Sequence, residues 1–238
     1  KHLALRMDNY LYLIINLSSL SVPLALSFEH RVAYFSKFIS LKFGFLITTT
    51  FFIVHDILFT YLGVWGFNDL YLIGVDIFGL PIEEWLFFFC IPFSSLFIHF
   101  CKEYFTPKLK LSHYASKIIS ISIIAFLIIT VILNPGNYYT VFALGLAALL
   151  MGLGFIRTPE MYSSFLLSYI FILIPFFIIN GLLTGSYIPS QIVWYNDLHN
   201  LGVRIGTIPF EDIFYGFSLL FLPLYLQEEM STRKSLKR

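Results

Sequence analysis

The stretch Asn68-Asp69-Leu70, followed by Gly74-Val75 and Pro81-Ile82-Glu83-Glu84, occurs twice in this chain. The second copy reads Asn196-Asp197-Leu198, Gly202-Val203 and Pro209-Phe210-Glu211-Asp212, and each part lies 128 residues after its counterpart. Upstream, the segment Asp56–Thr60 resembles Asn180–Thr184. Self-similarity at a fixed offset indicates an internal duplication, so we expect two copies of one structural unit.

The regions around these copies are too apolar for a water-soluble domain. Hydrophobic residues make up 58% of the chain and charged residues only 12%, about half the charged fraction of a soluble domain. Seven runs are each long enough to cross ~30 Å of hydrocarbon, which takes roughly 20 helical residues. They are Tyr10–Phe28, Phe43–Trp65, Pro81–Cys101, Ile118–Asn134, Tyr138–Ile156, Met161–Thr184 and Thr207–Leu226. The expected fold is an all-α integral membrane protein with about seven transmembrane helices.

The duplication also predicts how these spans are arranged. The first three correspond to the last three, and the fourth span connects the copies, so that both repeats point the same way through the membrane. The expected units are residues 1–112 and 135–230, with a connecting helix at 113–134 and a basic tail at 231–238. Residues 1–6 precede Met7, which we expect to be the natural start.

Parallel repeats place the acidic pairs Glu83-Glu84 and Glu211-Asp212 at the same membrane face. Asp56 arrives there from the second span, so every carboxylate inside an expected span is among these five, and no Lys or Arg lies within a span. A proline followed by acids also describes an ordinary helix start. However, a cap needs only one acid, whereas a charge deep in lipid costs ~2.5 to 3.5 kcal/mol. The repetition therefore favours a catalytic site.

Adjacent helical residues diverge by about 100°, so the two acids of one pair cannot share a face. Because Pro-x-Glu is identical in both copies, we rank Glu83 and Glu211 first as catalytic residues and expect Glu84 and Asp212 to support them by hydrogen bonding. Carboxyls that converge in a dry pocket cannot all ionise, and the shared protons that remain make a donor available at neutral pH.

Two alternative roles are open for each of several other polar and aromatic residues. Asp56 and Asn180 either support the acids or form a simple interhelical hydrogen bond. Asn68 and Asn196 either bind a ligand or form turns. Trp65, Trp85, Trp194 and Tyr215 either form an aromatic belt at the membrane surface or line the acidic pocket, where their faces could stabilise a carbocation.

Several classes of function are excluded by the sequence. His55, His99 and His199 lack the spacing of metal ligands, and no glycine-rich phosphate loop is present, so neither a metal nor a cofactor is expected. The basic residues are scattered and form no nucleic-acid patch. Most of them fall in the loops and tail on one side of the expected bundle, which predicts an N-terminus outside and a C-terminus in the cytoplasm, in a bacterial cytoplasmic membrane.

Three segments carry a resemblance to a known family: Gly63–Asn68, Gly79–Phe88 and Gly206–Tyr215. Here the chain resembles the membrane-bound lycopene cyclases of bacteria, archaea and fungi, and looks like the form in which two small subunits are fused. The resemblance implies cyclisation of the end groups of a linear carotenoid without net redox change, with Glu83, Glu84, Glu211 and Asp212 implicated in activity. It suggests β rings, a lipid environment and other carotenoid-pathway enzymes as partners.

Two other functions compete with this interpretation. A proton-coupled transporter also buries acids in repeated helices. A protein with a purely structural role would not explain repeated acids inside the membrane. A retinal photoreceptor is excluded, because its Schiff base requires a lysine within a span.

Overall fold

The computed structural model describes residues 8–235, so the expected start at Met7 and the segment 1–6 lie outside the described residues. Within that range the chain is mostly helical. The helices are α2 (Leu11–Leu26), α3 (Tyr34–Ser40), α4 (Lys42–Tyr61), α5 (Ile82–Phe105), α6 (His113–Leu133), α7 (Tyr138–Arg157), α8 (Pro159–Leu183) and α9 (Glu211–Ser235), with a 3₁₀ turn η1 at Asp69–Tyr71.

Five of these helices, α4 to α8, are long and apolar enough to cross a membrane, which indicates a membrane-associated protein. The shorter α2 is also apolar, whereas α9 carries acidic residues near both of its ends. Each expected span overlaps one of the helices from α2 and α4 to α9, and the short α3 was not expected.

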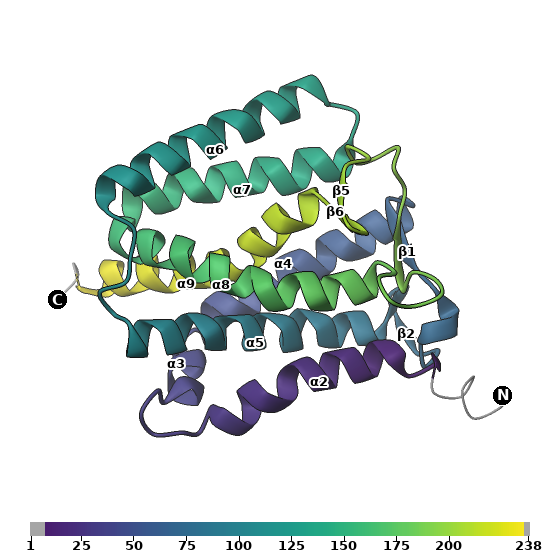
Figure 1. Cartoon of the computed structure of the whole chain (residues 1–238), viewed down its shortest axis with the longest axis horizontal. Coiled ribbons are helices and arrows are strands. Elements are labelled where there is room, and N and C mark those ends of the chain that lie inside the picture. Colours follow the sequence, from purple (N-terminus) through teal and green to yellow (C-terminus); the bar gives the residue numbers. More distant parts are fainter. Residues whose placement is uncertain (1–7, 236–238) are drawn as a thin grey trace.

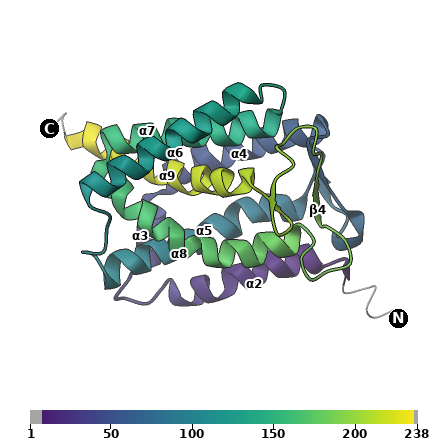
Figure 2. The same cartoon turned by 45° about the horizontal axis from the view of Figure 1, so that its top comes forward.

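The long helices run along one common direction, and all short strands gather at one end of the bundle (Figures 1 and 2). Helix α2 packs on α5, α6 on α7, and α9 on both α4 and α7. The cluster of strands closes the end at which α5 and α9 begin. We call it the strand end.

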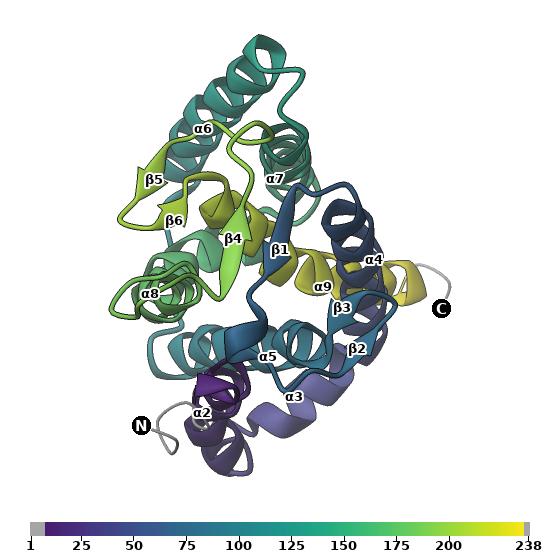
Figure 3. The same ribbon diagram turned by 90° about the vertical axis from the view of Figure 1, so that its right-hand side faces the viewer.

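Three two-stranded sheets make up the strand end (Figure 3). Strand β1 (Trp65–Phe67) pairs antiparallel with β4 (Val193–Tyr195). This sheet therefore joins segments from the two halves of the chain. The other two are local hairpins, β2 (Asp76–Ile77) with β3 (Leu80–Pro81), and β5 (Arg204–Ile205) with β6 (Ile208–Pro209).

These hairpins lead directly into the helices that carry the acidic pairs. Both residues of the first turn, Phe78 and Gly79, have positive φ, of 55° and 78°. Such a turn matches the twist of a two-residue hairpin. The hairpin ends at Pro81, which has an extended conformation and lacks an amide hydrogen, and α5 begins at the next residue. Glu83 and Glu84 therefore lie in the first turn of α5, just as Glu211 and Asp212 lie in that of α9.

Two expected helix ends differ from the structure because of these strands. The span Phe43–Trp65 ends as a helix at Tyr61, since Gly63 has a positive φ of 68° and Trp65 pairs in β1. The span expected from Thr207 starts as a helix only at Glu211, since Ile208 and Pro209 form β6.

Helix α5 extends beyond the expected span Pro81–Cys101 as far as Phe105, and this added turn includes Lys102 and Glu103. The Lys102 ammonium is buried and contacts the Glu103 carboxylate at 2.9 Å. This ion pair lies near the end of α5, far along the helix from its acidic first turn. The positive charge of Lys102 is therefore neutralised by its neighbour Glu103.

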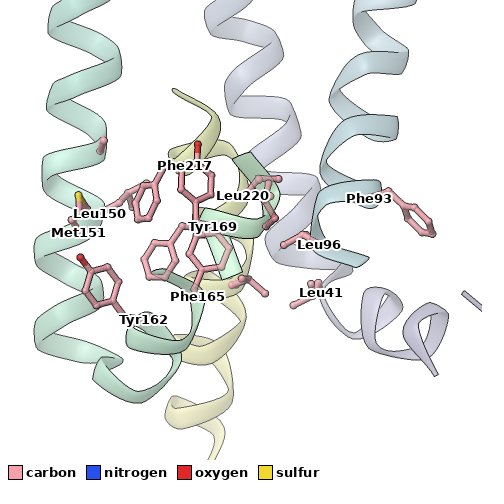
Figure 4. Packing of buried hydrophobic residues seen from close by; sticks show 14 of the residues in the cluster. Leu41, Phe93, Leu96, Leu150, Met151, Tyr162, Phe165, Tyr169, Phe217 and Leu220 are labelled. Atoms are coloured by element: carbon pink, nitrogen blue, oxygen red, sulfur yellow. The ribbon is translucent and has the colours of Figure 1, made fainter. Parts of the chain in front are cut away.

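The apolar core fills the part of the bundle away from the strand end. Figure 4 shows Phe165 and Tyr169 of α8 packed with Phe217 of α9, with ring centroids 5.7 Å apart for Phe165 and Phe217 and 5.4 Å for Tyr169 and Phe217. Close helix contact depends on Gly44, where an added Cβ would lie 2.5 Å from the carbonyl oxygen of Pro223. Small residues of this kind let membrane helices approach closely.

Candidate active site

A cavity of about 200 Å³ lies between α2, α5, α8 and α9, and it is closed by β1 and β4 at the strand end. Its lining on α5 runs from Glu84 to Ile98, and its lining on α8 runs from Leu183 to Tyr169. At ~1.5 Å per helical residue, each stretch covers about 20 Å. The cavity is thus long and narrow and follows the direction of the bundle.

The polar groups of the cavity are concentrated at its strand end. The carboxyl groups there belong to Asp56, Glu84 and Asp212, which are 2%, 7% and 4% exposed. The remaining walls are mostly aliphatic and aromatic, and the hydroxyl groups along them belong to Ser19, Ser94, Ser95 and Tyr169. No Lys, Arg or His is among the lining residues.

Glu84 and Asp212 occupy corresponding positions and have corresponding partners. The Tyr12 hydroxyl of α2 donates to Glu84, and the Tyr139 hydroxyl of α7 donates to Asp212. Asp212 also accepts hydrogen bonds from Asn180 Nδ2 at 2.6 Å and from the Tyr195 hydroxyl at 3.1 Å. Burial, followed by the nearby Asp212, raises the pKa of Tyr195 in β4 well above its usual range, so this hydroxyl keeps its proton and acts as a donor.

Asp56, from the last turns of α4, lines the same end of the cavity as Glu84. Its Oδ1 accepts a hydrogen bond of 2.5 Å from Trp65 Nε1. Asp56 and Asn180 therefore both reach the acids, each in its own half of the chain.

Glu83 and Glu211 do not line the cavity, although both are completely buried. Glu83 Oε1 accepts a hydrogen bond from the Ile73 amide at 2.7 Å, and Glu211 Oε1 accepts one from the Leu201 amide at 2.8 Å. Glu211 Oε1 also accepts from Thr140 Oγ1 at 2.6 Å. Each of these two carboxyl groups accepts a hydrogen bond from the loop that precedes its hairpin. Glu84 and Asp212 are therefore the acids of the two pairs that face the cavity.

The aromatic residues divide in the same way. Trp65 and Tyr215 line the cavity together with Tyr139 and Tyr195. The ring centroid of Trp65 lies 5.1 to 6.3 Å from those of the three tyrosines, and that of Tyr139 lies 5.7 Å from Tyr195 and 6.0 Å from Tyr215. Trp65 is only 6% exposed, so it faces the interior and not the membrane surface. Trp85 lies outside the cavity, where its Nε1 donates to the Ile77 carbonyl oxygen of the hairpin at 3.2 Å.

Asn68 and Asn196 act as turn residues. The side-chain oxygen of each accepts a hydrogen bond of 3.1 Å from the amide two residues later, in Leu70 and Leu198. Their amide groups donate across to the other half, Asn68 to the Gln191 carbonyl and Asn196 to the Gly63 carbonyl. They fix the loops that close the strand end.

Three residues that contact the acids were not predicted from the sequence, namely Tyr12, Tyr139 and Tyr195. Tyr12 and Tyr139 lie near the starts of two spans that are expected to correspond. Their separation along the chain is almost the same as that of Glu84 and Asp212, the acids that they contact, so the duplication could have pointed to them. Tyr195 precedes the repeated Asn196 and has Phe67 as its counterpart, so the duplication does not point to it.

In the part of the chain that the structure describes, no group of three or more His, Cys, Asp or Glu side chains could hold a metal ion. The arrangement offers instead a long apolar cavity with carboxyl groups and aromatic faces at one end. Such a site can bind a rod-like apolar molecule and transfer protons at its tip.

The comparison with protein families agrees with this chemistry. No curated protein and no solved structure matches the chain. The family model described as lycopene cyclase matches residues 9–102 and 136–230, which together make up most of the chain. This protein therefore belongs to the lycopene cyclase family.

Proposed function

We propose that this chain is a carotenoid end-group cyclase, an enzyme of the isomerase type, that forms β rings on lycopene or a close relative. The observation that carries the proposal is the long apolar cavity with the Glu84 and Asp212 carboxyls at its closed end. A linear carotenoid is a rod of similar character, which could place one end group beside the acids while its polyene extends along the helices.

The reaction needs a proton donor, a proton acceptor and protection from water. A carboxyl group protonates carbon 2 of the end group, which leaves a cation at carbon 1. The double bond between carbons 5 and 6 attacks that cation, so that a bond forms between carbons 1 and 6 and the positive charge moves to carbon 5. A carboxylate then removes the proton from carbon 6, which gives the β ring. Donor and acceptor return to their starting states between turnovers, so no net redox change occurs.

The surroundings of the acids suit the cationic intermediate. The faces of Trp65, Tyr139, Tyr195 and Tyr215 gather at the polar end of the cavity, where cation–π attraction stabilises positive charge. The apolar walls exclude water, which would otherwise capture the cation. We assign catalysis to Glu84 and Asp212, and support to Asp56, Asn180, Trp65 and Tyr215.

In this proposal Glu83 and Glu211 have a structural role, because each of them binds a loop amide instead of facing the cavity. We also propose that the two halves are parallel repeats. Support comes from the matched contacts of Tyr12 with Glu84 and of Tyr139 with Asp212, and from the fact that the family model matches in two segments.

The membrane orientation follows from the charges at the two ends of the bundle. Arg31, Lys37 and Lys42 lie at the end opposite the strands, as do the loop between α5 and α6 and the start of α6, with Lys108, Lys110 and Lys117. We therefore propose that this end faces the cytoplasm. The strand end and its acids would then lie near the outer surface.

The test is to express the chain in cells that make lycopene and to separate the extracted pigments by chromatography. Wild type is expected to yield one- or two-ringed carotenes, and Glu84→Gln is expected to leave lycopene unchanged. Glu160→Gln is the matched control, because the Glu160 side chain is 85% exposed at the far end of the bundle. Unchanged lycopene beside well-expressed wild type would contradict the proposal. Proton-coupled transport, the competing prediction, has no support from the family match.

A further inference from the structure

The two halves of the cavity carry different residues at one aligned position of the duplicated sequence, Asp56 in the first copy and Asn180 in the second. Asp56, late in α4, lines the same end of the cavity as Glu84, whereas Asn180, late in α8, donates a hydrogen bond to Asp212. One half therefore presents two carboxyl groups to the cavity, and the other presents a single carboxyl group with an amide.

In the first half, the two carboxyl groups lie in apolar surroundings with no lysine, arginine or histidine among the cavity-lining residues. Asp56 and Glu84 are almost fully buried. Two buried carboxyl groups that line the same end of an apolar cavity do not both ionise, so one proton is shared by the pair. Trp65 Nε1 donates to Asp56 and the Tyr12 hydroxyl donates to Glu84, so each acid also accepts a hydrogen bond from the protein.

In the second half, Asp212 receives hydrogen bonds from three neutral donors, namely Asn180, Tyr139 and Tyr195. Hydrogen bonds donated to a carboxylate favour its ionised form. Its neighbour Glu211 is turned toward the Leu201 amide and shares no partner with it. Asp212 is thus arranged to accept a proton.

We propose that the halves divide the chemistry, so that the Asp56–Glu84 pair is the acid and Asp212 is the base. This inference rests on the proposed function and assigns its two proton transfers to named groups. Glu84 transfers the shared proton to carbon 2, and Asp212 takes the proton from carbon 6. The proton then returns to the pair before the next ring is closed, so no proton is consumed.

The first test compares products, because loss of the acid and loss of the base stop the reaction at different points. Without the acid no cation forms, so Glu84→Gln is expected to leave lycopene intact. Asp212→Asn still permits protonation and ring closure, and the cation must then lose a proton elsewhere or capture water. Asp212→Asn is therefore expected to consume lycopene more slowly and to give ε or γ rings or hydroxylated products. Intact lycopene with Asp212→Asn, or altered rings with Glu84→Gln, would overturn the assignment.

The second test does not depend on turnover. Infrared spectroscopy of the purified protein in detergent, with exchange into D₂O, reports protonated carboxyl groups by their carbonyl band. Wild type is expected to show such a band, which Asp56→Asn and Glu84→Gln weaken and Asp212→Asn leaves unchanged. Asn180→Asp, which builds a second carboxyl pair, is expected to add to it. A band lost in Asp212→Asn instead would refute the division of roles.

The two tests separate this inference from the proposed function. If wild type forms no rings but the infrared bands follow the expected pattern, the function is wrong and the proton-sharing pair stands. If rings form but the bands depend on Asp212, the function stands and the division of roles is wrong.

Discussion

Replacing Glu211 by leucine or by glutamine separates a structural carboxyl from a catalytic one. Its Oε1 accepts hydrogen bonds from the Leu201 amide and from Thr140 Oγ1. Leucine removes this acceptor oxygen in a fully buried place, and each of the two donors left without a partner costs about 1–3 kcal/mol. Glu211→Leu is therefore expected to lower the free energy of unfolding by about 2–6 kcal/mol. Glutamine keeps an acceptor oxygen, so Glu211→Gln is expected to cost only about 1 kcal/mol.

Glu83 provides an internal comparison, because its side chain accepts from one donor, the Ile73 amide. Glu83→Leu is expected to cost about 1–3 kcal/mol, less than Glu211→Leu. The assay is SDS titration of the folded protein in mixed micelles, alongside pigment analysis in lycopene-producing cells. Both glutamine variants are expected to cyclise lycopene. A Glu211→Gln protein with unchanged stability and no activity would refute the structural assignment.

Four further predictions follow from the same geometry. Trp65→Phe keeps an aromatic face but removes the donor to Asp56, so we expect cyclase activity to fall while expression, checked by immunoblot, is unchanged; full activity would show that this hydrogen bond is dispensable. Tyr139→Phe removes one donor to Asp212, and we expect slower consumption of lycopene with a greater share of other ring isomers; an unaltered product pattern at a reduced rate would argue against a role in holding the base. Ile98→Trp fills the far end of the cavity and is expected to reduce conversion of the long substrate, whereas Ile178→Trp, whose position is 61% exposed, is the control and should retain activity. Gly44→Val introduces a Cβ 2.5 Å from the Pro223 carbonyl oxygen, and we expect destabilisation by about 1–3 kcal/mol in the SDS titration; wild-type stability would mean that α4 and α9 can move apart without loss.

Hydrophobic run length located the helices well, because lipid leaves the backbone no hydrogen-bonding partner except itself. Run length could not locate their ends at the strand end, where the chain leaves the helix while it is still apolar. Trp65, Ile208 and Pro209 are as apolar as a helix interior, yet they pair in short strands. The sequence signal for this change of backbone direction was the presence of glycines nearby, Gly63 and Gly206, which adopt positive φ in the structure.

The duplication pointed to both acidic pairs but did not predict which acid of each pair lines the cavity. Sequence identity between the copies ranked Glu83 and Glu211 first, since each is part of Pro-x-Glu. In the structure both glutamates accept a hydrogen bond from a loop amide, Glu83 from Ile73 and Glu211 from Leu201. A structural requirement common to both halves keeps the residue type the same, so identity between repeats is not evidence of catalysis.

The proposed difference in chemistry between the halves lies at positions where the repeats diverge. Glu84 corresponds to Asp212 and Asp56 corresponds to Asn180, and all four line the cavity. A cyclisation begins with proton donation and ends with proton removal, so a site with two identical halves would supply two acids or two bases. The change from Asp56 to Asn180 removes one carboxyl group and supplies a hydrogen-bond donor to Asp212. In the proposed division of roles, a duplicated helix start serves an asymmetric reaction, because a single substitution near each acid sets whether that acid holds a proton or accepts one.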